Sequence, residues 1–334
     1  MGITRRSGLI AAAAALAVAI AGCGGNSGGN GDDKAARQLG RLSIIAPAAP
    51  GSGWDQTARA VQDALQRNNL ARQVEVTNVP GASGTVALAQ VAAQKGKNDL
   101  LMMSGLAQLS GVITNNTDVT LGDLTPVARL IGEYETIVVP ADSPYQDLGD
   151  LLEAVKANPR GVPIAGGSAG SADHIFIGML AKAAGVDPAA VNFVPYSGGG
   201  EVTTALLGNK VAAGVSGTGE FQEQVKAGKL RALVVSSRTP LASMPGVPTI
   251  ADAGYPDLEF YNWRSIMAPA GLTEERKQAY VDAITAMHDS ESWQSTLKER
   301  AWEDTFLAGD EFANWLQQEQ ARVEEILTDL GLAK

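Results

Sequence analysis

The sequence predicts an α/β protein of two domains, joined by two crossings of the chain in a clamshell arrangement. Strand-like runs alternate with helix-like runs from residue 42 onward, which is typical of a mainly parallel sheet covered by helices. The block at roughly 141–256 is a complete α/β unit, whereas the helices after residue 272 have no strands of their own. Those helices must pack on something earlier, so we expect the chain to start in one domain, cross to a second and return.

A length of 334 residues suits two ordinary domains. We expect the crossings within 131–140 and 255–269. Domain 1 then comprises 41–135 together with 257–334, and domain 2 comprises 136–256. Two domains joined in this way place a ligand crevice between them.

The first 22 residues are typical of a secretory signal peptide. Arg5 and Arg6 precede an apolar run, 8–22, that is too short for a membrane span. The run ends in Ile20-Ala21-Gly22-Cys23, which resembles a bacterial lipobox, and Cys23 is the only cysteine in the chain. We predict that Cys23 is lipidated. A plain secretory signal with a chance cysteine is the alternative, and the arginine pair leaves twin-arginine export open.

Residues 23–40 are predicted to form a flexible tether, because glycine, asparagine and aspartate dominate their start. We therefore expect the folded part to be extracytoplasmic and held at the membrane by lipid. A net charge of −10 argues against nucleic acid as a partner and against a basic membrane-surface patch. We expect a monomer.

The helices follow from apolar spacing and from their end signals. The clearest is 148–157, where four apolar residues fall at i, i+3, i+4 and i+7 and Pro159 follows. A glycine follows each of three other predicted helices, as is common just past a helix C-terminus. Further helices are expected at 55–67, 85–94, 171–184, 200–207, 220–227, 273–289, 292–302 and 310–330. Strands are expected at 42–46, 74–79, 100–104, 136–140, 162–165, 191–196, 211–216, 230–236 and 260–268.

Four glycine-bearing turns each follow a strand-like run and lead into a helical pattern. A turn of this kind leaves backbone N–H groups free at the positive end of a helix, which suits an anion. Any single turn is explained equally well as a tight connection. Four of them at the carboxyl ends of strands favour a ligand, since open α/β sheets bind ligands at that edge. The turns lie at 49–55, 80–85, 166–171 and 196–200.

A hydrolase is the main alternative. Gly166-Gly167-Ser168-Ala169-Gly170 matches the G-x-S-x-G turn that carries a nucleophilic serine. A serine nucleophile needs a histidine base, and the chain has only His174 and His288. We expect His174 to lie within the helix that this turn opens and to point away from Ser168. The turn is better explained as an anion site, with hydroxyl donors from Ser168 and Ser171.

Two charged residues near the expected crevice have open roles. Arg264 lies on the predicted return strand, where it can pair with a ligand carboxylate or, equally well, with Glu133 or Glu135. Asp55 is expected to cap its helix and to pair with Arg59 four residues later.

Other site motifs are absent from the sequence. It has no nucleotide-binding G-x-x-x-x-G-K-[ST] or G-x-G-x-x-G turn. It has no paired histidines or cysteines for zinc, and its aspartates lack the spacing of a calcium loop. We expect no cofactor and no metal.

Several of these motifs together resemble the solute-binding proteins of tripartite tricarboxylate transporters, the Bug family. The resemblance extends from residue 42 to the C-terminal helices. The motifs that carry it are Pro50-Gly51-Ser52-Gly53-Trp54-Asp55-Gln56-Thr57-Ala58-Arg59, Asn78-Val79-Pro80-Gly81-Ala82-Ser83-Gly84, Ala165-Gly166-Gly167-Ser168-Ala169-Gly170, Val194-Pro195-Tyr196-Ser197-Gly198-Gly199-Gly200-Glu201 and Ser216-Gly217-Thr218-Gly219-Glu220.

The resemblance implies a periplasmic-binding-protein fold that captures a small carboxylate and delivers it to integral membrane transporter subunits. A ligand-capturing accessory of a signalling receptor is a further alternative, which the sequence does not separate from transport. It implies no enzymatic activity. One departure concerns the first turn, which is often Pro-Gly-Gly-Gly in relatives, whereas Ser52 replaces a glycine here. The identity of the ligand therefore does not carry over. Motifs and resemblance together give as predicted ligand-binding residues Ser52, Gly53, Trp54, Ala82, Ser83, Thr85, Ser168, Ala169, Ser171, His174, Ser197, Gly198 and Arg264.

Overall fold

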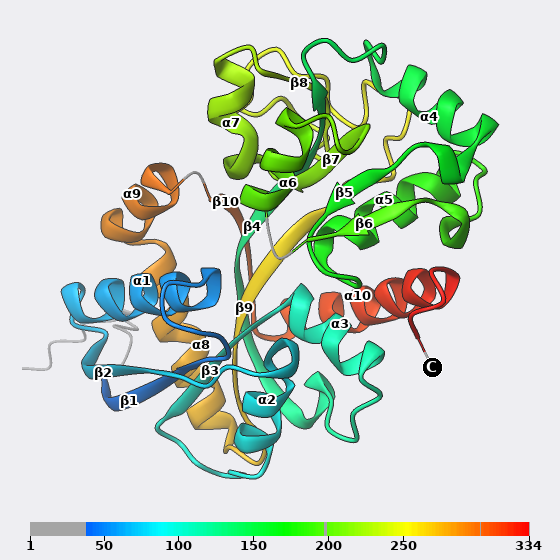
Figure 1. Ribbon diagram of the computed structural model, residues 1–334. Helices are drawn as coiled ribbons and strands as arrows, with labels where there is room; N and C mark the ends of the chain where they lie inside the picture. The colour runs from blue at the N-terminus through cyan, green and yellow to red at the C-terminus, as the bar shows by residue number, and fades with distance from the viewer. Residues whose placement is uncertain (1–37, 197–198, 301, 334) are drawn as a thin grey trace, which may run out of the picture. The chain divides into compact units, whose positions relative to one another are not determined.

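The computed structural model describes residues 38–196, 199–300 and 302–333 (Figure 1). Ala36–Lys334 form one compact unit, and the helices and strands of the fold lie within its described residues. The predicted signal peptide, Cys23, most of the tether, Ser197 and Gly198 lie outside the described residues.

Ten strands of the described chain form one hydrogen-bonded system in the order β2-β1-β3-β9-β4-β7-β5-β6, with β8 and β10 also pairing with β4. Their bounds are β1 (Leu39–Ala46), β2 (Ala71–Asn78), β3 (Leu100–Gly105), β4 (Leu124–Pro140), β5 (Ile164–Gly166), β6 (Phe193–Pro195), β7 (Ala213–Gly217), β8 (Leu230–Val235), β9 (Tyr261–Pro269) and β10 (Glu303–Ala308).

The sheet is mixed, which corrects the expectation of a mainly parallel one. β1 pairs in parallel with β2 and β3, and β5 pairs in parallel with β6 and β7. Every pairing of β4 and β9 is antiparallel. The reason is topological, because β4 carries the chain outward and β9 brings it back beside β4.

β4 joins the two halves of the sheet. Its first part, from Leu124 to Tyr134, pairs with β9, and its last part, from Glu135 onward, pairs with β7 and β8. One 17-residue strand thus runs through both halves. The domain boundaries stay a prediction.

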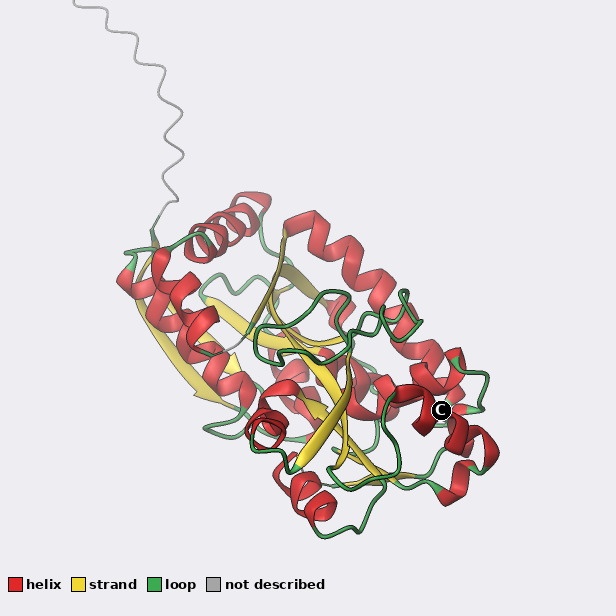
Figure 2. Ribbon diagram, turned by 90° about the horizontal axis from the view of Figure 1, so that it is seen from above, coloured by secondary structure: helices red, strands yellow, loops and turns green. Residues whose placement is uncertain are grey.

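The described chain contains ten α-helices and four short 3-10 helices. Figure 2 shows the helices around the strands. The predicted helix 148–157 is observed with the same ends, and Asp147 caps it by accepting a hydrogen bond from the N–H of Asp150. The bounds are α1 (Gly53–Arg67), α2 (Thr85–Ala92), α3 (Leu106–Thr114), α4 (Leu148–Ala157), α5 (Ala172–Ala183), α6 (Gly199–Leu207), α7 (Thr218–Lys226), α8 (Glu274–His288), α9 (Glu291–Glu299) and α10 (Gly309–Asp329).

Two elements were not expected from the sequence. α3 follows β3 directly, so the two elements form one apolar run in the sequence and only the strand was predicted. β10 lies between α9 and α10 and pairs with β4, so the expectation that the last helices have no strand of their own is wrong. Its six residues, Glu303–Ala308, begin with two acids and a threonine and end in three apolar residues, so they show no strand-like alternation.

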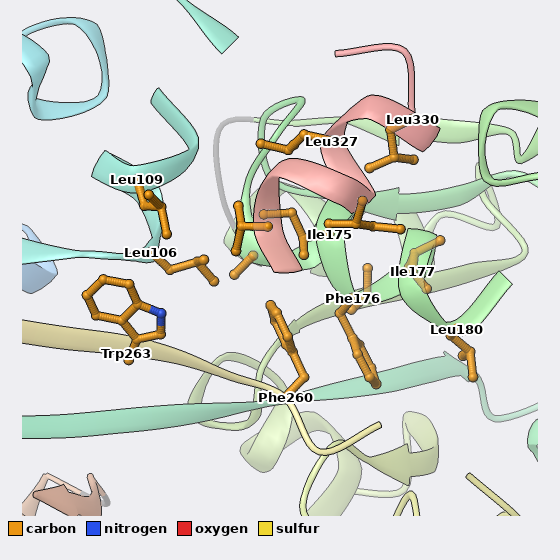
Figure 3. Close-up of a cluster of buried hydrophobic side chains, with 14 of the residues drawn as sticks. Leu106, Leu109, Ile175, Phe176, Ile177, Leu180, Phe260, Trp263, Leu327 and Leu330 are labelled. Atoms are coloured by element: carbon orange, nitrogen blue, oxygen red, sulfur yellow. The ribbon is translucent and has the colours of Figure 1, made fainter. Parts of the chain in front are cut away.

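One hydrophobic core connects elements from distant parts of the chain. Leu106 of α3, Phe176 of α5, Trp263 of β9 and Leu327 of α10 are all buried in it (Figure 3). α10 packs against α3, α5 and β4, so it contacts elements of both predicted domains. Gly178 of α5 makes room for Leu330, because a Cβ there would lie 3.0 Å from the nearest methyl carbon of Leu330.

Within the described residues, no helix combines the length and the apolar character that crossing a membrane requires.

Candidate ligand-binding site

The first glycine turn is closed by the side chains of Ser52, which precedes α1, and of Asp55 in its first turn. Ser52 is the N-cap and accepts a hydrogen bond from the N–H of Asp55 at 3.3 Å. The carboxylate of Asp55 reaches back and accepts from the N–H of Gly51 at 2.8 Å. The expectation that Asp55 caps the helix is therefore wrong: Ser52 precedes the first helical residue, and Asp55 lies three positions further on.

The expected pair of Asp55 with Arg59 is present, at 3.0 Å. The hydrogen bond from Arg59 lowers the pKa of Asp55 to about 2, supported by those from Gly51 and Asn78 and opposed by burial. Asp55 is thus an anion whose hydrogen bonds hold the turn, and its charge is met by Arg59.

Arg264 lies against the backbone of this turn. A Cβ on Gly53 would come within 2.7 Å of its guanidinium carbon. The guanidinium pairs with Glu133 and donates to the hydroxyl of Thr57 at 3.1 Å. The pair with Glu133 is one of the two roles considered for Arg264, and a ligand contact stays a prediction.

Trp54 connects the first turn to the second. A Cβ on Gly105 would lie 3.2 Å from its indole nitrogen, and a Cβ on Gly84 would lie 3.4 Å from the far edge of its ring. The ring therefore lies close to the backbone of both glycines. The structure thus brings together the turn at Gly53, the turn at Gly84 and the end of β3.

The second turn has an unusual backbone. Gly81, Ala82, Ser83 and Gly84 all have positive φ, at 137°, 46°, 55° and 87°. Two of them are not glycine, and backbone strain of this kind concentrates at binding sites. Ala82 and Ser83 are exposed.

Neighbouring groups hold this turn in place. Gln108 of α3 donates to the carbonyl of Gly84 at 2.8 Å, and the Thr85 hydroxyl donates to the carbonyl of Ala82 at 2.9 Å. The predicted contact Thr85 therefore uses its hydroxyl inside the turn. Gln108 was missed by sequence reasoning, although a lone amide in the apolar run 100–109 was a signal.

The turn between β5 and α5 uses part of its backbone internally. The N–H of Gly167 donates to Asp173 at 2.6 Å, and the N–H of Gly170 donates to Nδ1 of His174 at 3.2 Å. These two N–H groups are not free, contrary to the expectation for this turn. Ser168 and Ala169 are exposed at its tip.

His174 supports the turn and does not activate Ser168. Its ring stacks on Phe193 at a centroid distance of 4.0 Å, and its backbone N–H donates to the hydroxyl of Ser171 at 3.4 Å. Burial lowers the pKa of His174 to about 4, so the ring is neutral at pH 7 and Nδ1 accepts the hydrogen bond. Among the described residues no hydrogen bond joins His174 to Ser168, and Nδ1 of His174 is used by the N–H of Gly170.

Comparison with known proteins assigns the chain to a family. The family model described as "Tripartite tricarboxylate transporter family receptor" matches residues 57–332. The chain belongs to this receptor family. The resemblance inferred from the motifs is thereby confirmed.

The receptor is 32% identical to Protein BugT of Bordetella pertussis over 235 residues, which are 69% of this chain and 71% of that protein. Two solved structures from Rhodopseudomonas palustris share its fold. Rpa4515 with adipate matches with a TM-score of 0.71 at 22% identity, covering 88% of this chain and 98% of that one. MatC with bound malate matches with a TM-score of 0.68 at 22% identity, covering 86% and 99%.

These likenesses confirm the two-domain α/β periplasmic-binding-protein fold. The individual ligand contacts of the receptor stay predictions, Ser197 and Gly198 among them. Within the described residues, no group of three or more His, Cys, Asp or Glu side chains is placed to hold a metal ion.

The receptor also contains buried acids that sequence reasoning did not place in the site. Asp173 and Glu135 are 8% and 1% exposed. The sequence predicts Glu135 only as a partner of Arg264, and it predicts no individual role for Asp173. A weak signal was present, because Asp173 lies in the first turn of a helix that opens at a glycine turn.

Proposed function

We propose that this receptor captures a small di- or tricarboxylate outside the cell membrane and delivers it to the membrane subunits of a tripartite tricarboxylate transporter. The single observation that carries the proposal is the convergence of the turns at Gly53 and Gly84 around Trp54. A helix N-terminus and a strained turn meet there; helix N-termini suit anions, and backbone strain concentrates at binding sites.

The solved structures support the ligand class. One is described with bound malate and the other with adipate, and both molecules are dicarboxylates. At about 22% identity they support a carboxylate in general and not a particular one. We infer in addition that the chain is exported and held at the membrane by a lipid on Cys23, with residues 23–40 as a tether.

The proposed mechanism is closure around the ligand. One carboxylate first meets Ser52, Gly53 and the exposed residues of the second turn. The second domain then contributes Ser168 and its neighbours, with Ser171, Ser197 and Gly198 completing the contacts. Because the ligand bridges both domains only in the closed state, it selects that state, and the transporter recognises it.

A thermal-shift panel tests the proposal. We expect at least one di- or tricarboxylate to raise the midpoint, with about 2.7 kcal/mol of added stability at 100 times its Kd. Amino acids, aromatic acids, neutral sugars and peptides are the comparison ligands. A shift given by sugars or peptides and by no acid would overturn the carboxylate assignment.

A further inference from the structure

Two buried carboxyl groups lie directly beneath the β5–α5 turn. Glu135 belongs to β4 and Asp173 to the first turn of α5, and both side chains are shielded from water. α5 packs against β4, and Oε2 of Glu135 is buried there with no other hydrogen-bonding partner among the described residues. The two carboxyl groups lie close enough to share a hydrogen bond. An ionised carboxylate only accepts, so this hydrogen bond requires a proton on one of the pair.

Glu135 is the group that holds the proton. Burial and the neighbouring charge of Asp173 raise the pKa of Glu135 well above its usual range. Burial also raises the pKa of Asp173, to about 6, but hydrogen bonds from the N–H of Gly167, from its own N–H and from Glu135 oppose that rise. Asp173 is therefore the anion and Glu135 the donor.

Asp173 fixes the turn that presents Ser168. Its carboxylate accepts from the N–H of Gly167 at 2.6 Å, and a Cβ on Gly166 would lie 3.0 Å from its own Cβ. Glu135 is fixed in turn by the sheet, where its N–H donates to the hydroxyl of Ser236 at 2.9 Å. A chain of contacts thus runs from β4 through Asp173 to the tip of the turn.

The surroundings of the pair make loss of the proton costly. Glu133 of β4 and Glu220 of α7 also act on Glu135, and both raise its pKa further. Arg264 of β9 forms its salt bridge with Glu133. His174 of α5 is neutral at pH 7. Within the described chain, neither Glu135 nor Asp173 forms a salt bridge with a cation, so deprotonation leaves two adjacent buried anions without compensation.

We propose that Glu135 is a positioning residue of the ligand site, whose carboxyl proton holds Asp173 and, through it, the turn at residues 166–171. Its use in ligand capture rests on the proposed function. The binding-competent turn carries this proton, so raising the pH removes it and weakens binding. Above the pH at which the proton leaves, affinity falls by up to about tenfold per pH unit.

The first test needs no ligand. The full chain is labelled with ¹⁵N-glycine, and the amide signal of Gly167, assigned with Gly167→Ala, is followed from pH 7 to pH 10, above the titration of Asp173. We expect it to shift with pH in the wild type. In Glu135→Gln we expect a pH-independent signal, because the amide donates to Asp173 at every pH. Glu303→Gln is the control, since burial also raises the pKa of Glu303 but this side chain belongs to β10.

The second test measures adipate binding by calorimetry over the same pH range. We expect affinity to fall with rising pH in the wild type and in Glu303→Gln, and to stay level in Glu135→Gln. A Gly167 signal that is flat in the wild type, or that titrates equally in Glu135→Gln, overturns the positioning role. An absence of adipate binding with a titrating Gly167 signal counts against adipate as the ligand and leaves the positioning role supported.

Discussion

At the scale of single residues, glycines determine how closely the parts of the site approach. Gly53 lets the guanidinium of Arg264 lie on the first turn, and Gly84 and Gly105 leave room for the ring of Trp54. The sequence placed Gly53 and Gly84 in predicted anion-binding turns, and it placed Arg264 on a strand beside the expected crevice. It could not show that they touch, because that contact depends on the register between β9 and β4.

We expect Gly53→Ala to weaken both folding and ligand binding. The added methyl group must displace Arg264, which disturbs its pair with Glu133. Overpacking of this kind costs about 1–3 kcal/mol. Urea unfolding and carboxylate binding by calorimetry measure the two effects. Gly40→Ala is the matched control, because a Cβ on Gly40 meets nothing within 4 Å. Equal stability of the two variants would contradict the close approach.

At the scale of elements, local signals decided which helices could be predicted. α4 was predicted at both ends because Asp147, the apolar spacing and Pro159 all act within its own turns. α3 was missed because β3 and α3 form one apolar run, divided only by the backbone geometry around Gly105. The start of α5 was predicted. The hydrogen bonds from the preceding turn to Asp173 and His174 were not predicted, since they depend on burial of these side chains by other elements.

The start of α5 gives a prediction on pH. The pKa of His174 is about 4 in the folded protein, against an ordinary value of 6.5. Between these values the unfolded chain binds more protons, so this residue makes the free energy of unfolding fall as the pH drops from 6.5 to 4. Protonation also removes Nδ1 as the acceptor for Gly170.

His174→Gln isolates this contribution, because glutamine still offers an acceptor but does not titrate. Urea unfolding at pH 7 and pH 4.5 measures it. We expect the free energy of unfolding to fall less with acid in the variant than in the wild type. An equal fall in both proteins would show that His174 does not carry this part of the acid sensitivity.

At the scale of the whole molecule, the two predicted domains share structure in β4 and α10. β4 pairs with strands of both halves of the sheet, and α10 packs on α3 and on α5 (Figure 1). The sequence predicted the fold class through its motifs, and its helical spacing showed that α10 has a buried face. Spacing alone cannot say which element covers such a face, so the contact with α5 was not predicted.

Because of this shared core we expect residues 38–333 to unfold in a single thermal transition. Neither half of the sheet keeps a complete core when the other half unfolds. Gly178→Val tests it at the contact between α5 and α10, where a side chain must push Leu330 away. We expect a loss of about 1–3 kcal/mol and one transition that moves to lower temperature as a whole. Gly219→Val on α7 is the control, since a Cβ there meets nothing within 4 Å. Two separate calorimetric peaks, with only one shifted by Gly178→Val, would mean that the domains fold independently and that α10 joins them only loosely.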